Sequence, residues 1–144
     1  LENKRSVSSD VAGLSKSDIG KLDLKWAFAY PNAKQARSQP IVSKGEIFLG
    51  SHDGTVYSLD LKTGCANWTF SADSEVRHAL SLGPWKQDES EALFFGDNAG
   101  NVYAIDRVAG ELIWKTNPND PPDTVITGSP KLYGDKLYVP LSSR

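Results

Sequence analysis

Few residues in this sequence could carry out chemistry by themselves. Cys65 is the single cysteine, which rules out an internal disulfide, a CxxC redox pair and a CxxCH haem attachment within this chain. No helix start or basic cluster beside Cys65 would lower the pKa of its thiol, so a structural thiol is favoured over a reactive one. His52 and His78 belong to no cluster with cysteines or carboxylates, so we do not expect them to bind zinc. We expect His52 to be a turn residue and His78 to be a packed or solvated residue. These residues alone predict no catalytic group and no metal site.

The composition excludes two classes of partner. Sixteen Lys and Arg stand against eighteen Asp and Glu without a basic run, so nothing predicts binding to nucleic acid. No apolar run approaches the roughly 18 residues of a membrane span, and the start LENKRSVSSD lacks the apolar core of a secretion signal. With 144 residues, 39% of them hydrophobic, the chain has the make-up of one soluble domain or of a piece of a larger one.

A 21-residue unit occurs twice. Residues 50–70, GSHDGTVYSLDLKTGCANWTF, match residues 96–116, GDNAGNVYAIDRVAGELIWKT, without a gap and at a constant offset. The shared positions are Gly50/Gly96, Gly54/Gly100, Val56/Val102, Tyr57/Tyr103, Asp60/Asp106, Gly64/Gly110 and Trp68/Trp114. In GTVYSLD and GNVYAID apolar residues alternate with small or polar ones, which is the period of a half-buried strand. Each unit therefore predicts two strands joined by a turn.

Two more apolar strands precede each unit. The predicted strands are 38–42, 46–50, 56–60 and 66–70, followed by 78–82, 92–96, 102–106 and 112–116. Four short antiparallel strands that recur with this period are typical of the blades of a β-propeller. The sequence thus predicts an all-β fold of four-stranded blades.

The pattern also divides the chain into domains. Residues 1–22 are predicted to be an N-terminal extension with one short helical turn, in which Ser15 and Asp18 form a capping box. Residues 23–144 are predicted to be a partial propeller: a last blade strand at 23–28, blades at 36–70 and 77–116, and a partial blade at 127–144. The repeated tryptophans, Trp26, Trp68 and Trp114, are expected to pack between blades.

Such a stack is open at both ends. Blade faces are apolar and pack on neighbouring blades, so about two and a half blades leave hydrophobic faces and strand edges uncovered. Because about four to eight blades normally close a ring, we interpret the chain as a segment of a larger propeller or as one that completes its sheets by self-association.

The pattern G-x(3)-G-x-V-Y-x-[LI]-D-x(3)-G-x(3)-W resembles the repeat of quinoprotein dehydrogenases, which depend on pyrroloquinoline quinone (PQQ) and have an eight-bladed propeller. The resemblance is closest to the polyvinyl-alcohol dehydrogenase branch, and it also rests on GLSKSDIGKLDLKWAFAYP, ARSQPIV, SEVRHAL and ITGSPKLYGDKLYVPLSS. It implies PQQ as cofactor, oxidation of an alcohol, a cytochrome as electron acceptor and a periplasmic location. It also implies that later blades of the complete enzyme hold the aspartate base and a calcium ion.

The resemblance further implies cofactor-binding residues. PQQ is a flat ortho-quinone with carboxylates, so its site needs cationic or hydroxyl donors. Arg77 stands where the family places an arginine on PQQ, Thr127 where it places a threonine, and Ser142 or Ser143 near a serine that contacts a carboxylate. Arg37 stands where larger members have an acidic residue, and their adjacent cysteine pair is absent here. The remaining walls of the site would lie in other blades, so we expect the chain alone to bind PQQ weakly or not at all and to be inactive.

Simpler roles remain open for the same residues. Arg37 and Arg77 could be ordinary strand-end arginines that pair with Asp73 or Glu75. Thr127 could do no more than satisfy backbone groups at the start of a strand.

A second function of a different class is also compatible with the repeat. It is a non-catalytic propeller that presents its loops or strand edges to protein partners, as the similar outer-membrane assembly scaffold does. Arg77 and Thr127 favour the enzyme, whereas the short chain and the absent haem motif leave room for the scaffold.

Overall fold

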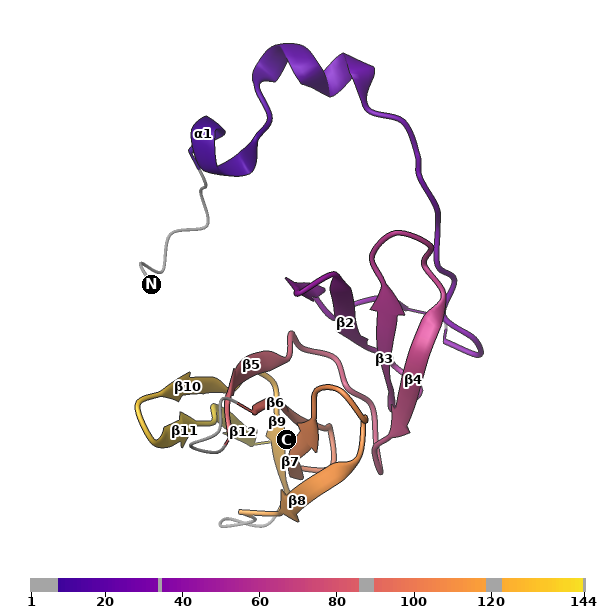
Figure 1. Cartoon of the computed structure of the whole chain (residues 1–144). Helices are drawn as coiled ribbons and strands as arrows, with labels where there is room; N and C mark the ends of the chain where they lie inside the picture. The colour runs from indigo at the N-terminus through magenta and orange to yellow at the C-terminus, as the bar shows by residue number, and fades with distance from the viewer. Residues whose placement is uncertain (1–7, 34, 86–89, 119–122, 144) are drawn as a thin grey trace.

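The computed structural model describes residues 8–33, 35–85, 90–118 and 123–143 of the chain. It begins with a short helix α1 (Ser9–Ala12) and a 3₁₀ helix over Lys16–Lys21. The predicted capping box is present, because the backbone N–H of Ser15 donates to the Asp18 carboxylate at 3.0 Å. This N-terminal arm extends away from the sheets (Figure 1).

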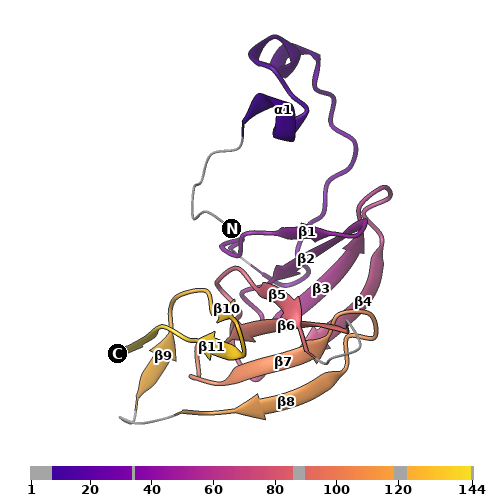
Figure 2. The same ribbon diagram turned by 60° about the vertical axis from the view of Figure 1, so that its left-hand side comes forward.

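Two four-stranded antiparallel sheets form the body of the described chain. The first sheet contains β1 (Ile41–Ser43), β2 (Glu46–Gly50), β3 (Thr55–Asp60) and β4 (Ala66–Ser71). The second sheet contains β5 (Ser81–Pro84), β6 (Glu91–Gly96), β7 (Val102–Asp106) and β8 (Leu112–Thr116). In both, the strands pair in chain order, and the second sheet lies beside the first (Figure 2). The predicted all-β fold of four-stranded blades is therefore confirmed.

The repeat in sequence is a repeat in structure. The ladder between the third and fourth strands is interrupted at the same point in both sheets, after Ser58 and after Ala104. The repeated aspartate explains the following turn, since Asp60 accepts the backbone N–H groups of the two residues that close it, at 3.0 and 2.7 Å. Asp106 does the same at 2.8 and 2.7 Å. An aspartate that caps its own turn in this way favours a tight connection between the strands.

Three strand predictions need correction. β1 begins at residue 41 instead of 38, and β5 begins at 81 instead of 78. The ladder of the first sheet stops short because the N–H of Gly50 donates to the side chain of Ser38 and not to a backbone carbonyl. Residues 23–28 were predicted to be a blade strand but have no strand assignment, since no strand of the described chain pairs with them.

A third unit follows the second sheet. β10 (Lys131–Tyr133) and β11 (Lys136–Tyr138) form an antiparallel hairpin within residues 127–144, which were predicted to be a partial blade. Beside it, β9 (Thr124–Ile126) pairs with β12 (Leu141–Ser143), a pairing that the sequence analysis did not anticipate.

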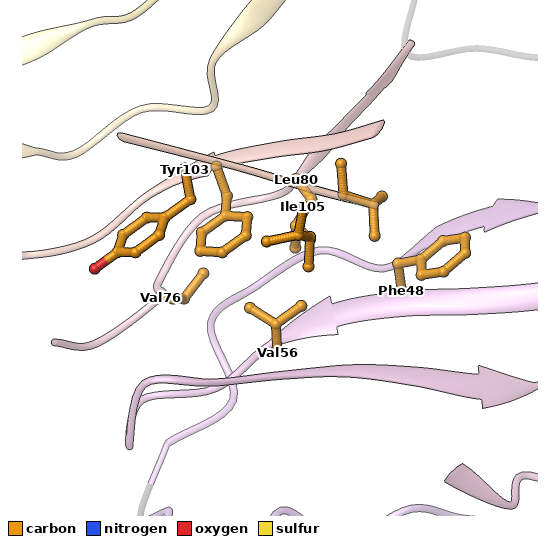
Figure 3. Packing of buried hydrophobic residues seen from close by; sticks show 8 residues of the cluster. Phe48, Val56, Val76, Leu80, Tyr103 and Ile105 are labelled. Carbon is orange, nitrogen blue, oxygen red and sulfur yellow. The ribbon is translucent and has the colours of Figure 1, made fainter. Parts of the chain in front are cut away.

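The core of the molecule lies between the two sheets. Its eight buried residues are Phe48, Val56, Val76, Leu80, Leu93, Phe95, Tyr103 and Ile105. In Figure 3, Val56 of the first sheet lies opposite Ile105 of the second, while Phe48 and Tyr103 lie at the two ends of the cluster. Burial of apolar area between the blades is thus the main attraction that sets them face to face.

Two of the repeated tryptophans pack against the turn of the next unit, as the sequence analysis predicted. Ring atoms of Trp26 lie 2.7 Å from where a Cβ on Gly64 would be, and ring atoms of Trp68 lie 2.5 Å from the same point on Gly110. In both cases the indole N–H donates to the carbonyl three residues before that glycine, at 3.1 Å. Only glycine leaves room for the ring, and both glycines have positive φ.

Charged residues join the sheets at the end where these turns lie. Arg107, in the turn directly after β7, pairs with Glu46 of the first sheet, and its Nε lies 3.1 Å from Oε2 of Glu91. The Arg107 side chain is 13% exposed, so this pair is shielded from water more than an ordinary surface ion pair.

Candidate cofactor site

The opposite end of the sheets carries the predicted site residues. This connection end is formed by the turns 51–54 and 97–101 and by the connection 72–80 between the two sheets. The backbone N–H of Val76 donates to Ser51 in the first turn, and the N–H of Asn98 donates to Glu75, both at 3.0 Å. The connection is therefore hydrogen-bonded to turns of both blades.

Three of the predicted residues occupy one repeated structural position. Each stands four residues before a first strand: Arg37 before β1, Arg77 before β5 and Thr127 before β10. Arg77 is half-buried, whereas Arg37 and Thr127 are exposed. The chain thus presents three donor side chains from successive units at the same end of the fold.

The contacts of the residues that precede them show that Arg77 and Thr127 occupy equivalent positions. Val76, directly before Arg77, has its Cγ1 2.5 Å from where a Cβ on Gly50 would be. Ile126, directly before Thr127, has its Cγ2 2.4 Å from the same point on Gly96. The last residue of each second strand is therefore a glycine because the following connection crosses directly over it.

Ser142 and Ser143 lie on β12, next to the strand that leads to Thr127. Ser142 pairs with Val125 and Ser143 with Thr124, so Ser142 is half-buried on the small sheet that ends at Ile126. The pairing of β9 with β12 brings Ser142 and Thr127, which are far apart along the chain, to the same edge.

Among the described residues, the carboxylates near the site form their ion pairs with residues other than Arg37 and Arg77. Asp73 pairs with Lys115, and Oε1 of Glu75 lies 3.7 Å from Nδ1 of His52. His78 is half-buried, and burial lowers the pKa of its imidazole; the charge of Arg77 lowers it further, against a backbone hydrogen bond to Ile126 that raises it.

A buried carboxylate that sequence reasoning missed holds the turn at 97–101. Asp97 is fully buried and accepts hydrogen bonds from the side-chain amide of Asn101 and the hydroxyl of Tyr103, both at 2.8 Å. The same hydroxyl accepts the backbone N–H of Asp73 at 3.0 Å, which ties the turn to the connection. Burial raises the pKa of Tyr103, and the Asp97 carboxylate adds to this. The one available signal was that Asp97 replaces Ser51 of the first repeat.

The donor set fits the carboxylates of a flat anionic cofactor. A guanidinium can bind a carboxylate in a bidentate manner, and hydroxyl groups can donate to carboxylate or quinone oxygens. In the described part of the chain no group of three or more His, Cys, Asp or Glu could hold a metal ion. Cys65 is free and exposed on the turn at the opposite end of the first sheet, away from these donors.

Comparison with known proteins places the chain in a family. Residues 3–143 match the profile of a PQQ-repeat family described as outer membrane protein assembly factor BamB. The chain belongs to this PQQ-repeat family. Among the described residues of this family member, no helix is long and apolar enough to cross a membrane.

Curated relatives of the PQQ-repeat chain include two polyvinylalcohol dehydrogenases. The chain is 38% identical to that of Pseudomonas sp. over 134 residues, which are 91% of this chain and 20% of the relative. It is 38% identical to that of Sphingopyxis sp. (strain 113P3) over 132 residues, 90% of this chain and 20% of the relative. The chain therefore spans about a fifth of the length of these proteins.

A solved structure shows the same fold. A europium-containing methanol dehydrogenase superimposes on 90% of this chain with a TM-score of 0.69, at 22% sequence identity and over 24% of its own chain. The chain is thus part of a PQQ-type β-propeller.

Proposed function

We propose that this chain is a segment of a PQQ-dependent alcohol dehydrogenase of the polyvinyl-alcohol dehydrogenase type. The observation that carries the proposal is the position shared by Arg77 and Thr127 in successive units, in a chain that is 38% identical to two such dehydrogenases. When bound, PQQ supplies the two-electron acceptor for oxidation of an alcohol, and a cytochrome then takes the electrons. A periplasmic location accords with this chemistry.

In this proposal the residues of the connection end bind and orient the cofactor. The Arg77 guanidinium would pair with a carboxylate of the cofactor, and the hydroxyls of Thr127 and Ser142 would donate to its carboxylate or quinone oxygens. Arg37 extends the cationic rim, and Ser143 continues the strand that carries Ser142. These residues would orient the cofactor, and the other walls of its site would belong to other blades.

The residues for chemistry proper lie elsewhere in the proposed enzyme. We assign the catalytic base and a calcium ion to blades outside these 144 residues. A ligand that is contacted on one side only buries less of its surface, but its binding still costs the same translational and rotational entropy. The 144-residue chain by itself should therefore bind PQQ weakly and oxidise no alcohol.

Titration of PQQ into the complete gene product tests the proposal. Arg77→Ala should weaken binding by about 1.5–3 kcal/mol, the value of a hydrogen bond to a charged group. Lys62→Ala removes an exposed cation from the turn at the opposite end of the first sheet and should leave the affinity unchanged. Equal affinities for wild type and Arg77→Ala would remove Arg77 from the site.

A scaffold that binds other proteins is the second candidate, and the description of the matching family favours it. In that case the complete gene product would bind no PQQ at all, which the same titration detects. The exposed hairpin β10–β11 supports a role in association, since Tyr133 is 78% and Tyr138 57% exposed. We propose that this hairpin and the open strand edges drive self-association when the chain is alone.

A further inference from the structure

We propose that Ser38 is a positioning residue for Arg77, a role that rests on the proposed function. Ser38 precedes β1 and is half-buried at the connection end. Its hydroxyl oxygen accepts the backbone N–H of Gly50 at 3.1 Å and donates to the carbonyl of His78 at 2.9 Å. One side chain thus links the end of β2 to the carbonyl of His78, the residue directly after Arg77.

The backbone on the other side of Arg77 is held by the same strand end. The N–H of Val76 donates to the carbonyl of Ser51 at 3.0 Å, and the side chain of Val76 packs directly on Gly50. Arg77 therefore lies between two residues that are both attached to the end of β2. This arrangement sets the direction in which the guanidinium leaves the backbone, although Ser38 itself need not touch a ligand.

The chemistry of the link requires a hydroxyl group. A short side chain that donates and accepts at once can join an N–H to a carbonyl, and serine and threonine provide this. Alanine at position 38 would leave the N–H of Gly50 and the carbonyl of His78 without these partners. The segment around Arg77 would then be more mobile in the free protein, and ordering it when the cofactor binds would reduce the affinity.

The next unit carries a comparable link. His78 stands three residues before β5, as Ser38 stands three residues before β1. The backbone of Ile126, the residue directly before Thr127, interacts with the imidazole of His78 and raises its pKa against the effect of burial. In both units the side chain at this position thus reaches the backbone beside the next predicted cofactor ligand.

The test is a titration of PQQ, followed by tryptophan fluorescence, into variants of the complete gene product. Ser38→Ala should weaken binding about 3- to 10-fold, the range expected for one or two neutral hydrogen bonds. Ser38→Thr keeps the hydroxyl and should restore the affinity to within about twofold of wild type. Ser58→Ala is the matched control, because the buried Ser58 also makes two side-chain hydrogen bonds, to Glu46 and Asn67, away from the connection end.

The double variant separates positioning from general stability. If Ser38 acts through Arg77, Ser38→Ala should change the affinity less than about twofold in an Arg77→Ala background. The same loss with and without Arg77, or an equal loss in Ser58→Ala, would make Ser38 a structural residue only. If the wild type and Ser38→Ala bind PQQ equally well, the inference about Ser38 is wrong and the proposed function still stands. If the wild type binds no PQQ, both the inference and the proposed function are wrong.

Discussion

Substituting alanine for Gly110 should weaken the contact between the two blades. The free-energy cost of this contact can be separated from the cost of the backbone conformation by a second variant. Gly110 has a φ of +70°, and an alanine Cβ there would lie 2.5 Å from the Trp68 ring. Alanine in this backbone region costs about 1–2 kcal/mol, and forcing the indole away adds about 1–3 kcal/mol of overpacking. The Trp68 hydrogen bond to the carbonyl of Arg107, now 3.1 Å long, would be strained by the same displacement.

A matched glycine separates the two contributions. Gly45 has a φ of +80°, but nothing lies within 4 Å of its would-be Cβ, so Gly45→Ala should cost the backbone term alone. Hydrogen exchange followed by mass spectrometry, on peptides covering β3–β4 and β7–β8 of the complete gene product, reports local opening. Exchange should be faster in Gly110→Ala than in Gly45→Ala by about 5- to 150-fold, which corresponds to the overpacking term. Equal acceleration in the two variants would show that the tryptophan contact does not hold the blades together.

Two further predictions concern the buried tyrosine and the exposed hairpin. Tyr103→Phe should lower the free energy of unfolding by about 1–3 kcal/mol, because Asp97 loses a buried donor; Tyr133→Phe, at a 78% exposed position, should leave the denaturation midpoint unchanged. In the folded protein the pKa of Tyr103 lies above the ordinary value of about 10, so the free energy of unfolding should be constant below that pH and fall above it. Denaturation of Tyr103→Phe at pH 9–11 should show a smaller decrease of this free energy with pH than the wild type does. The 144-residue chain alone should sediment as an oligomer, and a monomer at all concentrations would contradict the proposed self-association.

Most of the fold could be predicted because it depends on local rules. Alternation of apolar residues marked β2, β3, β6 and β7, and the repeated aspartates and glycines marked the turns between strands. The starts of β1 and β5 were both placed three residues too early. For β1 the reason is that nothing local reveals that a side chain, Ser38, takes the place of a backbone partner at the end of the ladder. Residues 23–28 have the composition of a strand, but a strand also needs a partner, and that is a property of the surroundings.

The candidate site was predicted less completely. Resemblance to a family singled out Arg77 and Thr127 one by one, while the packing of Val76 on Gly50 and of Ile126 on Gly96 shows that they share one structural position. The buried Asp97 was missed, since an aspartate in a turn is usually explained by the turn alone.

The sequence by itself determined the repeating unit, its four strands and the tryptophans and glycines that join one unit to the next. These follow from residue types at short, regular spacings, so local sterics and the alternation of apolar side chains are enough to specify them. Only the tertiary structure decided which connections cross which turns, how Ser38 and Asp97 are hydrogen-bonded, and that β12 returns to pair with β9. Those contacts join residues that are distant in the chain, and they form because packing two blades face to face brings their backbones within hydrogen-bonding distance.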